Sequence, residues 1–238
     1  MIPRNDEIKS AARTSLSGHY TPIVMAFLTA EMILWLFGTF LSTPSRTALG
    51  SLTSMALSFI VSVILLVIDA GFHYMYLQLA RHRQIRIMDM FRCFRWQSNT
   101  SIALALLLSL LNLGASLPFL LLSIVAPGLY SGIAGNILLS LVHICILAVI
   151  NIIYSMTFFI LADTPDLSPV QIMKKSRSLT RGYRFRLAGL AISMIGYVLL
   201  GIISFGIGLL WVFPYFGTIL AHFYLFCADR KEPQAADT

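Results

Sequence analysis

The sequence predicts an all-α polytopic membrane protein with six transmembrane helices and amphipathic helices at the membrane interface. Of its 238 residues, 58% are apolar and only 11% are charged, whereas soluble domains carry about 25% charged residues. Several apolar runs exceed the roughly 18 residues that indicate a membrane-spanning helix. All but one of the 17 Lys and Arg residues lie in the termini and in alternate gaps between these runs, which is the charge distribution that the positive-inside rule describes.

Six apolar runs are long enough to span a membrane, and together they predict a single membrane domain. They cover about residues 22–41, 52–77, 101–126, 134–162, 187–206 and 209–227. The N-terminal segment, the second and fourth gaps and the C-terminal tail hold 16 of the 17 Lys and Arg residues. Because basic residues near span ends stay in the cytoplasm during insertion, we expect both termini there, which requires an even number of spans.

Three segments that precede pairs of spans have the pattern of amphipathic helices, namely residues 5–20, 81–96 and 168–182. In the third, Ser168, Pro169 and Gln171 predict a capping box with proline at the first helical position, and Gly182 is placed to end the helix. We expect the apolar side to face lipid or the spans. Shifts of 79 and 164 residues align the segments, which predicts a threefold repeat of interfacial helix and helical hairpin. The alternative is that any interfacial helix before a span has this pattern.

Two carboxylates fall near the middle of predicted spans, Glu31 in the first and Asp69 in the second. His73 follows Asp69 by one helical turn and so lies on the same helix face. A charge at that depth is costly unless it is paired, protonated or hydrated. These three residues are a candidate intramembrane polar cluster that could relay protons or bind a cation, and we expect both acids to face the bundle interior. The alternative is a neutral acid that makes one interhelical hydrogen bond.

The second candidate site is the basic cytoplasmic face. It suits anionic lipid headgroups, at about 1 kcal/mol per basic residue near the surface, or a membrane protein partner. Its candidate residues are Arg86, Arg92, Arg95, Lys174, Lys175, Arg177 and Arg181. Nucleic acid is not an expected partner, because the sequence holds no recognisable nucleic-acid-binding module and the arginines lie within a turn or two of lipid.

The sequence shows no signature of catalysis, metal binding or a cofactor. Its three cysteines are dispersed, which argues against a zinc site or a disulfide framework, and metalloprotease, serine-hydrolase and P-loop motifs are absent. His143 and His222 are isolated in their spans and are interpreted as packed side chains. The acidic turn from Asp163 to Asp166 is interpreted as a helix stop, and Gly206-Ile207-Gly208 as a tight turn between the last two spans.

Four features of the C-terminal half occur together: the Ser168-Pro169 start, the segment from Ser176 to Gly182, the Gly206-Ile207-Gly208 turn leading to Trp211, and Pro214-Tyr215 followed by Phe223-Tyr224. With them, about residues 154–226 resemble a bacterial membrane-protein family catalogued as domain of unknown function nine-seven-five. The N-terminal half resembles it more weakly, through Ala11, Ala12 and Leu16, and Tyr197 stands where the family tends to have Trp. The resemblance implies a six-span protein of the bacterial plasma (inner) membrane and carries over no catalytic residue.

Three functions remain open at this point. A non-catalytic membrane module that binds lipid or a protein partner at its basic face is favoured, because the polar content of the spans is thin for a substrate path. A transporter or channel-like protein would instead use Glu31 and Asp69. An intramembrane enzyme could assemble sparse residues from different spans, although no motif indicates one.

Overall fold

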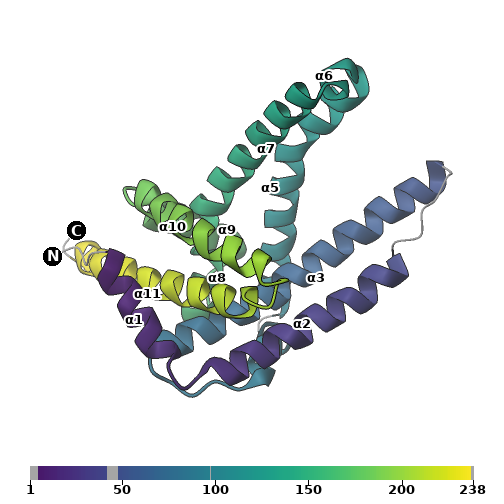
Figure 1. Cartoon of the computed structure of the whole chain (residues 1–238). Helices are drawn as coiled ribbons and strands as arrows, with labels where there is room; N and C mark the ends of the chain where they lie inside the picture. Colours follow the sequence, from purple (N-terminus) through teal and green to yellow (C-terminus); the bar gives the residue numbers. More distant parts are fainter. Residues whose placement is uncertain (1–4, 42–47, 97, 237–238) are drawn as a thin grey trace.

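The structure is a computed structural model that describes residues 5–41, 48–96 and 98–236 of the chain (Figure 1). Every described element is helical, which confirms the predicted all-α class. The elements in chain order are α1 (Asn5–Leu16), α2 (Tyr20–Leu41), α3 (Ala48–Ala80), η1 (Ile87–Phe91), α4 (Arg92–Trp96), α5 (Ser98–Val125), α6 (Gly128–Ser131), α7 (Ile133–Tyr154), α8 (Thr157–Asp163), α9 (Pro169–Thr180), α10 (Arg184–Ile203) and α11 (Leu209–Ala236).

Five helical stretches among the described residues are long and apolar enough to cross a membrane, which indicates a multi-pass membrane protein. They are Ala56–Ala80 in α3, Ser98–Val125, Ile133–Asp163 through α7 and α8, Arg184–Ile203, and Leu209–Arg230 in α11. Within α2, the described residues give a shorter apolar stretch, Tyr20–Ile33. The first predicted span, at about 22–41, and with it the total of six spans, therefore stay predictions.

The centre of the protein is formed by α3, α8 and α11. Helix α3 packs against both of the others, and the side chains of α8 from Thr157 to Leu161 are all buried. The Phe159 ring of α8 stacks on Tyr224 of α11, with ring centroids 5.5 Å apart. Gly217 lets α11 approach α3 closely, because a Cβ at this position would overlap the Tyr76 ring. The three helices therefore enclose an aromatic core.

The fourth predicted span, residues 134–162, is interrupted in the structure, since α7 ends at Tyr154 and α8 begins at Thr157. A helix end leaves backbone carbonyls without donors from its own helix. Here α9 supplies them: the hydroxyls of Ser176 and Thr180 each lie 3.2 Å from the Ile153 carbonyl oxygen. Both of these side chains are buried, so the break in the span is the place where α9 docks.

Helices α5, α6 and α7 form an arm that extends away from the two termini, and α2 with the first half of α3 forms a second (Figure 1). Helix α7 has no buried residue, and large apolar side chains are exposed along it, from Ile133 to Val149. Exposed apolar surface of this extent is unusual for a soluble protein. It is what a helix in contact with lipid requires.

The expected amphipathic helices are present in the first and third segments, as α1 and α9. In α9, Ser168 and Gln171 form the expected capping box, and Gly182 follows with a φ of +94°. The second segment differs, because residues 81–96 do not form one helix. Residues 83–86 have no regular structure, and the Arg86 N–H donates to the Asp89 carboxylate at 2.7 Å. That bond starts a new helical turn at Ile87, so the helical part is confined to η1 and α4. The threefold repeat stays a prediction.

Candidate functional site at the polar end of the bundle

The expected intramembrane cluster is only partly assembled. Glu31 is exposed on α2 beside Met32 and Trp35, so the expectation that it faces the bundle interior is wrong. Asp69 is also not buried, since 49% of its side chain is exposed. Among the described residues, no hydrogen bond or ion pair joins Glu31 to Asp69 or to His73.

Asp69 and His73 do lie together on α3, as their spacing predicted. The His73 Nδ1 is 2.8 Å from the Asp69 carbonyl oxygen and 3.5 Å from its carboxylate. The imidazole packs between aromatic rings, with centroid distances of 5.5 Å to Phe158 and 4.7 Å to Phe159. These contacts make His73 part of the aromatic core. Within the described chain, no group of three potential metal ligands comes together.

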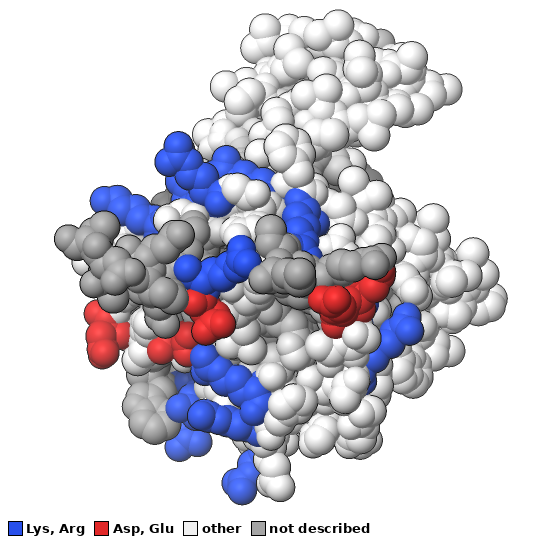
Figure 2. All heavy atoms as spheres, turned by 90° about the vertical axis from the view of Figure 1, so that its left-hand side faces the viewer, with Lys and Arg blue, Asp and Glu red and all other residues white. Residues whose placement is uncertain are grey.

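Charged side chains gather at the end of α3 that holds Ala80, on the side of the molecule where both termini lie (Figure 1). We call this region the polar end; it comprises α1, the η1–α4 segment, the start of α5, α9, and the ends of α3, α8 and α11 nearest the termini. Figure 2 shows its Lys and Arg side chains in several groups with acidic side chains among them, whereas the arm above them is without charge. The polar end is therefore the region in which a polar ligand would bind.

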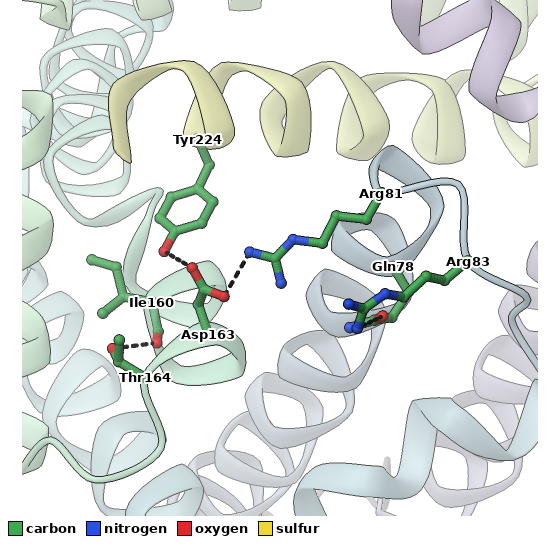
Figure 3. A network of polar contacts seen from close by, with 7 residues as sticks. All are labelled: Gln78, Arg81, Arg83, Ile160, Asp163, Thr164 and Tyr224. Carbon is green, nitrogen blue, oxygen red and sulfur yellow. Dashed lines mark hydrogen bonds and ion pairs between the residues drawn. The ribbon is translucent and has the colours of Figure 1, made fainter. Parts of the chain in front are cut away.

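The polar end contains an ion pair that sequence reasoning missed (Figure 3). The Arg81 guanidinium, just after α3, donates to the Asp163 carboxylate at 2.6 Å. The second carboxylate oxygen accepts a hydrogen bond from the Tyr224 hydroxyl of α11 at 3.0 Å. The three side chains join the ends of α3 and α8 to α11. We call this group the Arg81–Asp163–Tyr224 junction.

Local structure explains why these side chains meet. Asp163 is the last residue of α8, where a negative charge is unfavourable because the helix dipole leaves its own negative end there. Arg81 neutralises that charge. The Arg81 backbone N–H still donates to the Leu77 carbonyl of α3 at 3.1 Å, and the chain turns at the next residue, His82, whose φ is 55°. The Thr164 hydroxyl donates to the Ile160 carbonyl at 2.9 Å. The end of α8 is therefore stabilised both at a backbone carbonyl and at the Asp163 side chain.

Helix α1 docks on α10 and α11 through polar contacts as well as its apolar side. The Ser15 hydroxyl lies 3.0 Å from Nε2 of His222, a residue interpreted from sequence as packed. The Arg186 Nε donates to the Asn5 side chain at 2.8 Å. Because Ile8, Ala12 and Leu16 are also buried, the apolar side of α1 faces the spans and not lipid.

Helix α9 has the same arrangement, with a buried apolar side and an outward basic side. Ile172, Ser176 and Leu179 are buried against the bundle. Its candidate residues Lys174, Arg177 and Arg181 are exposed and Lys175 is partly so. The four basic side chains are thus presented outward by a helix that is itself fixed to the protein.

The remaining candidates lie on the η1–α4 segment, where Arg86 and Arg95 are exposed. The Arg92 guanidinium lies over the Tyr74 ring of α3, 4.5 Å from its centroid. The neighbouring Cys93 is buried, and burial raises the pKa of its thiol. Arg92 and Cys93 both line a cavity of about 590 Å³, which sequence reasoning did not foresee because its walls come from four separate segments.

These helices and their polar end define a multi-pass membrane protein without a recognisable catalytic or metal centre among the described residues. The chain belongs to the family described as Protein of unknown function (DUF975), whose model matches residues 1–231. The match confirms the resemblance found in the C-terminal half and extends it over the N-terminal half. No curated protein and no solved structure matches the chain.

Proposed function

We propose that the chain is a non-catalytic integral membrane protein whose basic cytoplasmic face binds anionic lipid headgroups, with α9 as the principal contact. The observation that supports this proposal is the orientation of α9. Its apolar side is buried in the protein, so membrane insertion does not occupy it, and its basic side is left for an external partner.

The electrostatics of α9 suit a membrane surface. Helix α9 carries Lys174, Lys175 and Arg177, Arg181 follows directly after its last residue, and the helix contains no acidic side chain. Each basic residue near an anionic membrane surface contributes about 1 kcal/mol, so four of them amount to about 4 kcal/mol at low salt. Salt screens such contacts, and a contact of this kind is therefore strongly salt-dependent.

The test is the thermal stability of the purified protein in neutral detergent with added phosphatidylglycerol or phosphatidylcholine. We expect phosphatidylglycerol to raise the melting temperature more, and the difference to vanish at high salt. A variant with Lys174, Lys175, Arg177 and Arg181 all changed to Gln should lose the difference. Its matched control exchanges Lys for Arg and Arg for Lys at the same positions and should keep it.

Both variants alter outward side chains, so both are expected to fold. If the Gln variant retains the full preference for phosphatidylglycerol, the proposal is wrong. Pull-down of a membrane protein by the wild type and the control, but not by the Gln variant, would instead assign the same surface to a protein partner.

A further inference from the structure

The cavity beside Arg92 has a chemistry that the outward basic side of α9 lacks. Arg92 and Cys93 of α4 line it together with the polar side chains of Ser98, Asn99 and Thr100, and Asp166 enters its wall from the loop between α8 and α9. The site thus carries one guanidinium, one carboxylate and three side chains that form hydrogen bonds. A ligand with a positive and a negative group complements it better than a simple anion, which Asp166 would repel.

The position of Arg92 suits a phosphate group. Its guanidinium is held over the Tyr74 ring at 4.5 Å, and a guanidinium fixed in this way loses little conformational freedom on binding. Arginine binds phosphate through charge-assisted hydrogen bonds. The hydroxyl and amide groups of Ser98, Asn99 and Thr100 can donate to the same phosphate. Asp166, which is exposed, can accept hydrogen bonds from an ammonium group.

An apolar stripe continues from this cavity along α5. Asn99 lines the cavity, and the residues that follow it at spacings of three and four are all exposed and apolar: Ile102, Leu106, Leu110, Leu113 and Leu117. This spacing places them on one face of the helix. From Asn99 to Leu117 the helix rises about 27 Å at 1.5 Å per residue, close to the roughly 30 Å of a bilayer core. The stripe is therefore long enough for acyl chains.

We infer that the cavity binds the headgroup of a diacyl phospholipid that bears a phosphate and a primary ammonium, as phosphatidylethanolamine does. The phosphate lies against Arg92 and its polar neighbours, the ammonium against Asp166, and the acyl chains along the α5 stripe. The inference rests on the proposed lipid-binding role and adds a discrete site with a different headgroup preference from that of α9.

The experiment measures lipid binding to the full chain in neutral detergent by native mass spectrometry. The probes are phosphatidylethanolamine, phosphatidylcholine, phosphatidylglycerol and soluble phosphoethanolamine. Phosphatidylcholine is the critical comparison, because its quaternary ammonium has no N–H to donate. One charge-assisted hydrogen bond corresponds to about a tenfold preference for phosphatidylethanolamine over phosphatidylcholine.

The Asp166→Asn variant should lose this tenfold preference while it still binds both phospholipids, and Asp166→Glu should keep it. Arg92→Gln should weaken the binding of both phospholipids, and Arg92→Lys should retain part of it, because lysine keeps the positive charge but lacks the planar fork of the guanidinium. Asp229→Asn, which removes an exposed carboxylate outside the cavity, is the matched control and should bind as the wild type does.

Failure of this inference is distinguishable from failure of the proposed function. The α9 Gln variant should lose the stabilisation by phosphatidylglycerol and keep the preference for phosphatidylethanolamine. The Asp166→Asn variant should keep the stabilisation by phosphatidylglycerol and lose the preference for phosphatidylethanolamine. An unchanged preference in Asp166→Asn overturns the site. Equal affinity for soluble phosphoethanolamine overturns the acyl-chain contact and identifies a small phosphorylated amine as the ligand.

Discussion

Removing the carboxylate of the Arg81–Asp163–Tyr224 junction should destabilise the protein by about 2–4 kcal/mol. In Asp163→Ala, the Tyr224 hydroxyl loses a charged acceptor, and a hydrogen bond to a charged group contributes about 1.5–3 kcal/mol. Tyr224 is 1% exposed, so water cannot readily replace the carboxylate. The ion pair adds less, because 29% of the Arg81 and 27% of the Asp163 side chain are exposed; we take about 0.5–1 kcal/mol for it.

A double-mutant cycle isolates the contact between Tyr224 and Asp163. The assay is reversible unfolding of the purified protein in mixed micelles, followed by circular dichroism as denaturing detergent is added. Tyr224→Phe should cost about 1.5–3 kcal/mol in the wild type and almost nothing in Asp163→Ala. Arg83→Gln is the control: Arg83 is exposed and its contact with Gln78 is 3.4 Å long, so a change within about 0.5 kcal/mol is expected. An equal effect of Tyr224→Phe in both backgrounds would refute the reasoning.

Three further predictions concern packing, docking and reactivity. Gly217→Ala should destabilise by about 1–3 kcal/mol by overpacking against Tyr76, whereas Gly114→Ala, with open space around its Cβ, should be neutral or stabilising in the same unfolding assay. Ser176→Ala should cost about 1 kcal/mol, because the Ile153 carbonyl at the break loses the Ser176 hydroxyl as a donor; faster proteolysis near the break would report weaker docking of α9. Since burial raises the pKa of Cys93 and the thiolate is the reactive form, maleimide labelling should be slower than for free cysteine, and its rate should still rise above about pH 9. A labelling rate that levels off near neutral pH would contradict that shift.

The sequence predicted the features that depend on local chemistry. The capping box at Ser168 requires only three neighbouring residues, and the end of α9 requires only a glycine that tolerates positive φ at Gly182. The turn between α10 and α11 is of the same kind: Gly206 has a φ of +84°, and the Ser204 hydroxyl accepts the Gly208 N–H at 2.8 Å. The length of the apolar runs predicted the long helices, because a helix in lipid makes its backbone hydrogen bonds within itself and so depends only on its own segment.

Contacts between distant segments could not be predicted in this way. Asp163 was interpreted as part of a helix stop, and α8 does end there. Its side-chain partners, however, are 82 and 61 residues away in the sequence. Nothing in the spacing of Arg81 or Tyr224 indicates that α3, α8 and α11 converge. Likewise, Glu31 was expected inside the bundle because an intramembrane charge is costly, yet that cost can be reduced by protonation or by hydration at the place where the side chain is exposed.

The structure also changes how the basic residues should be counted. Topology depends on their number at one side of the membrane, but ligand binding depends on what each side chain already contacts. Arg81 is committed to Asp163 and Arg186 to Asn5, whereas the stack of Arg92 on Tyr74 leaves its guanidinium in the cavity wall. The basic side chains of α9 instead point outward from a docked helix. Fewer basic side chains are therefore available to lipid headgroups than the net charge suggests. Binding should be measured first at the outward side of α9 and at the cavity beside Arg92.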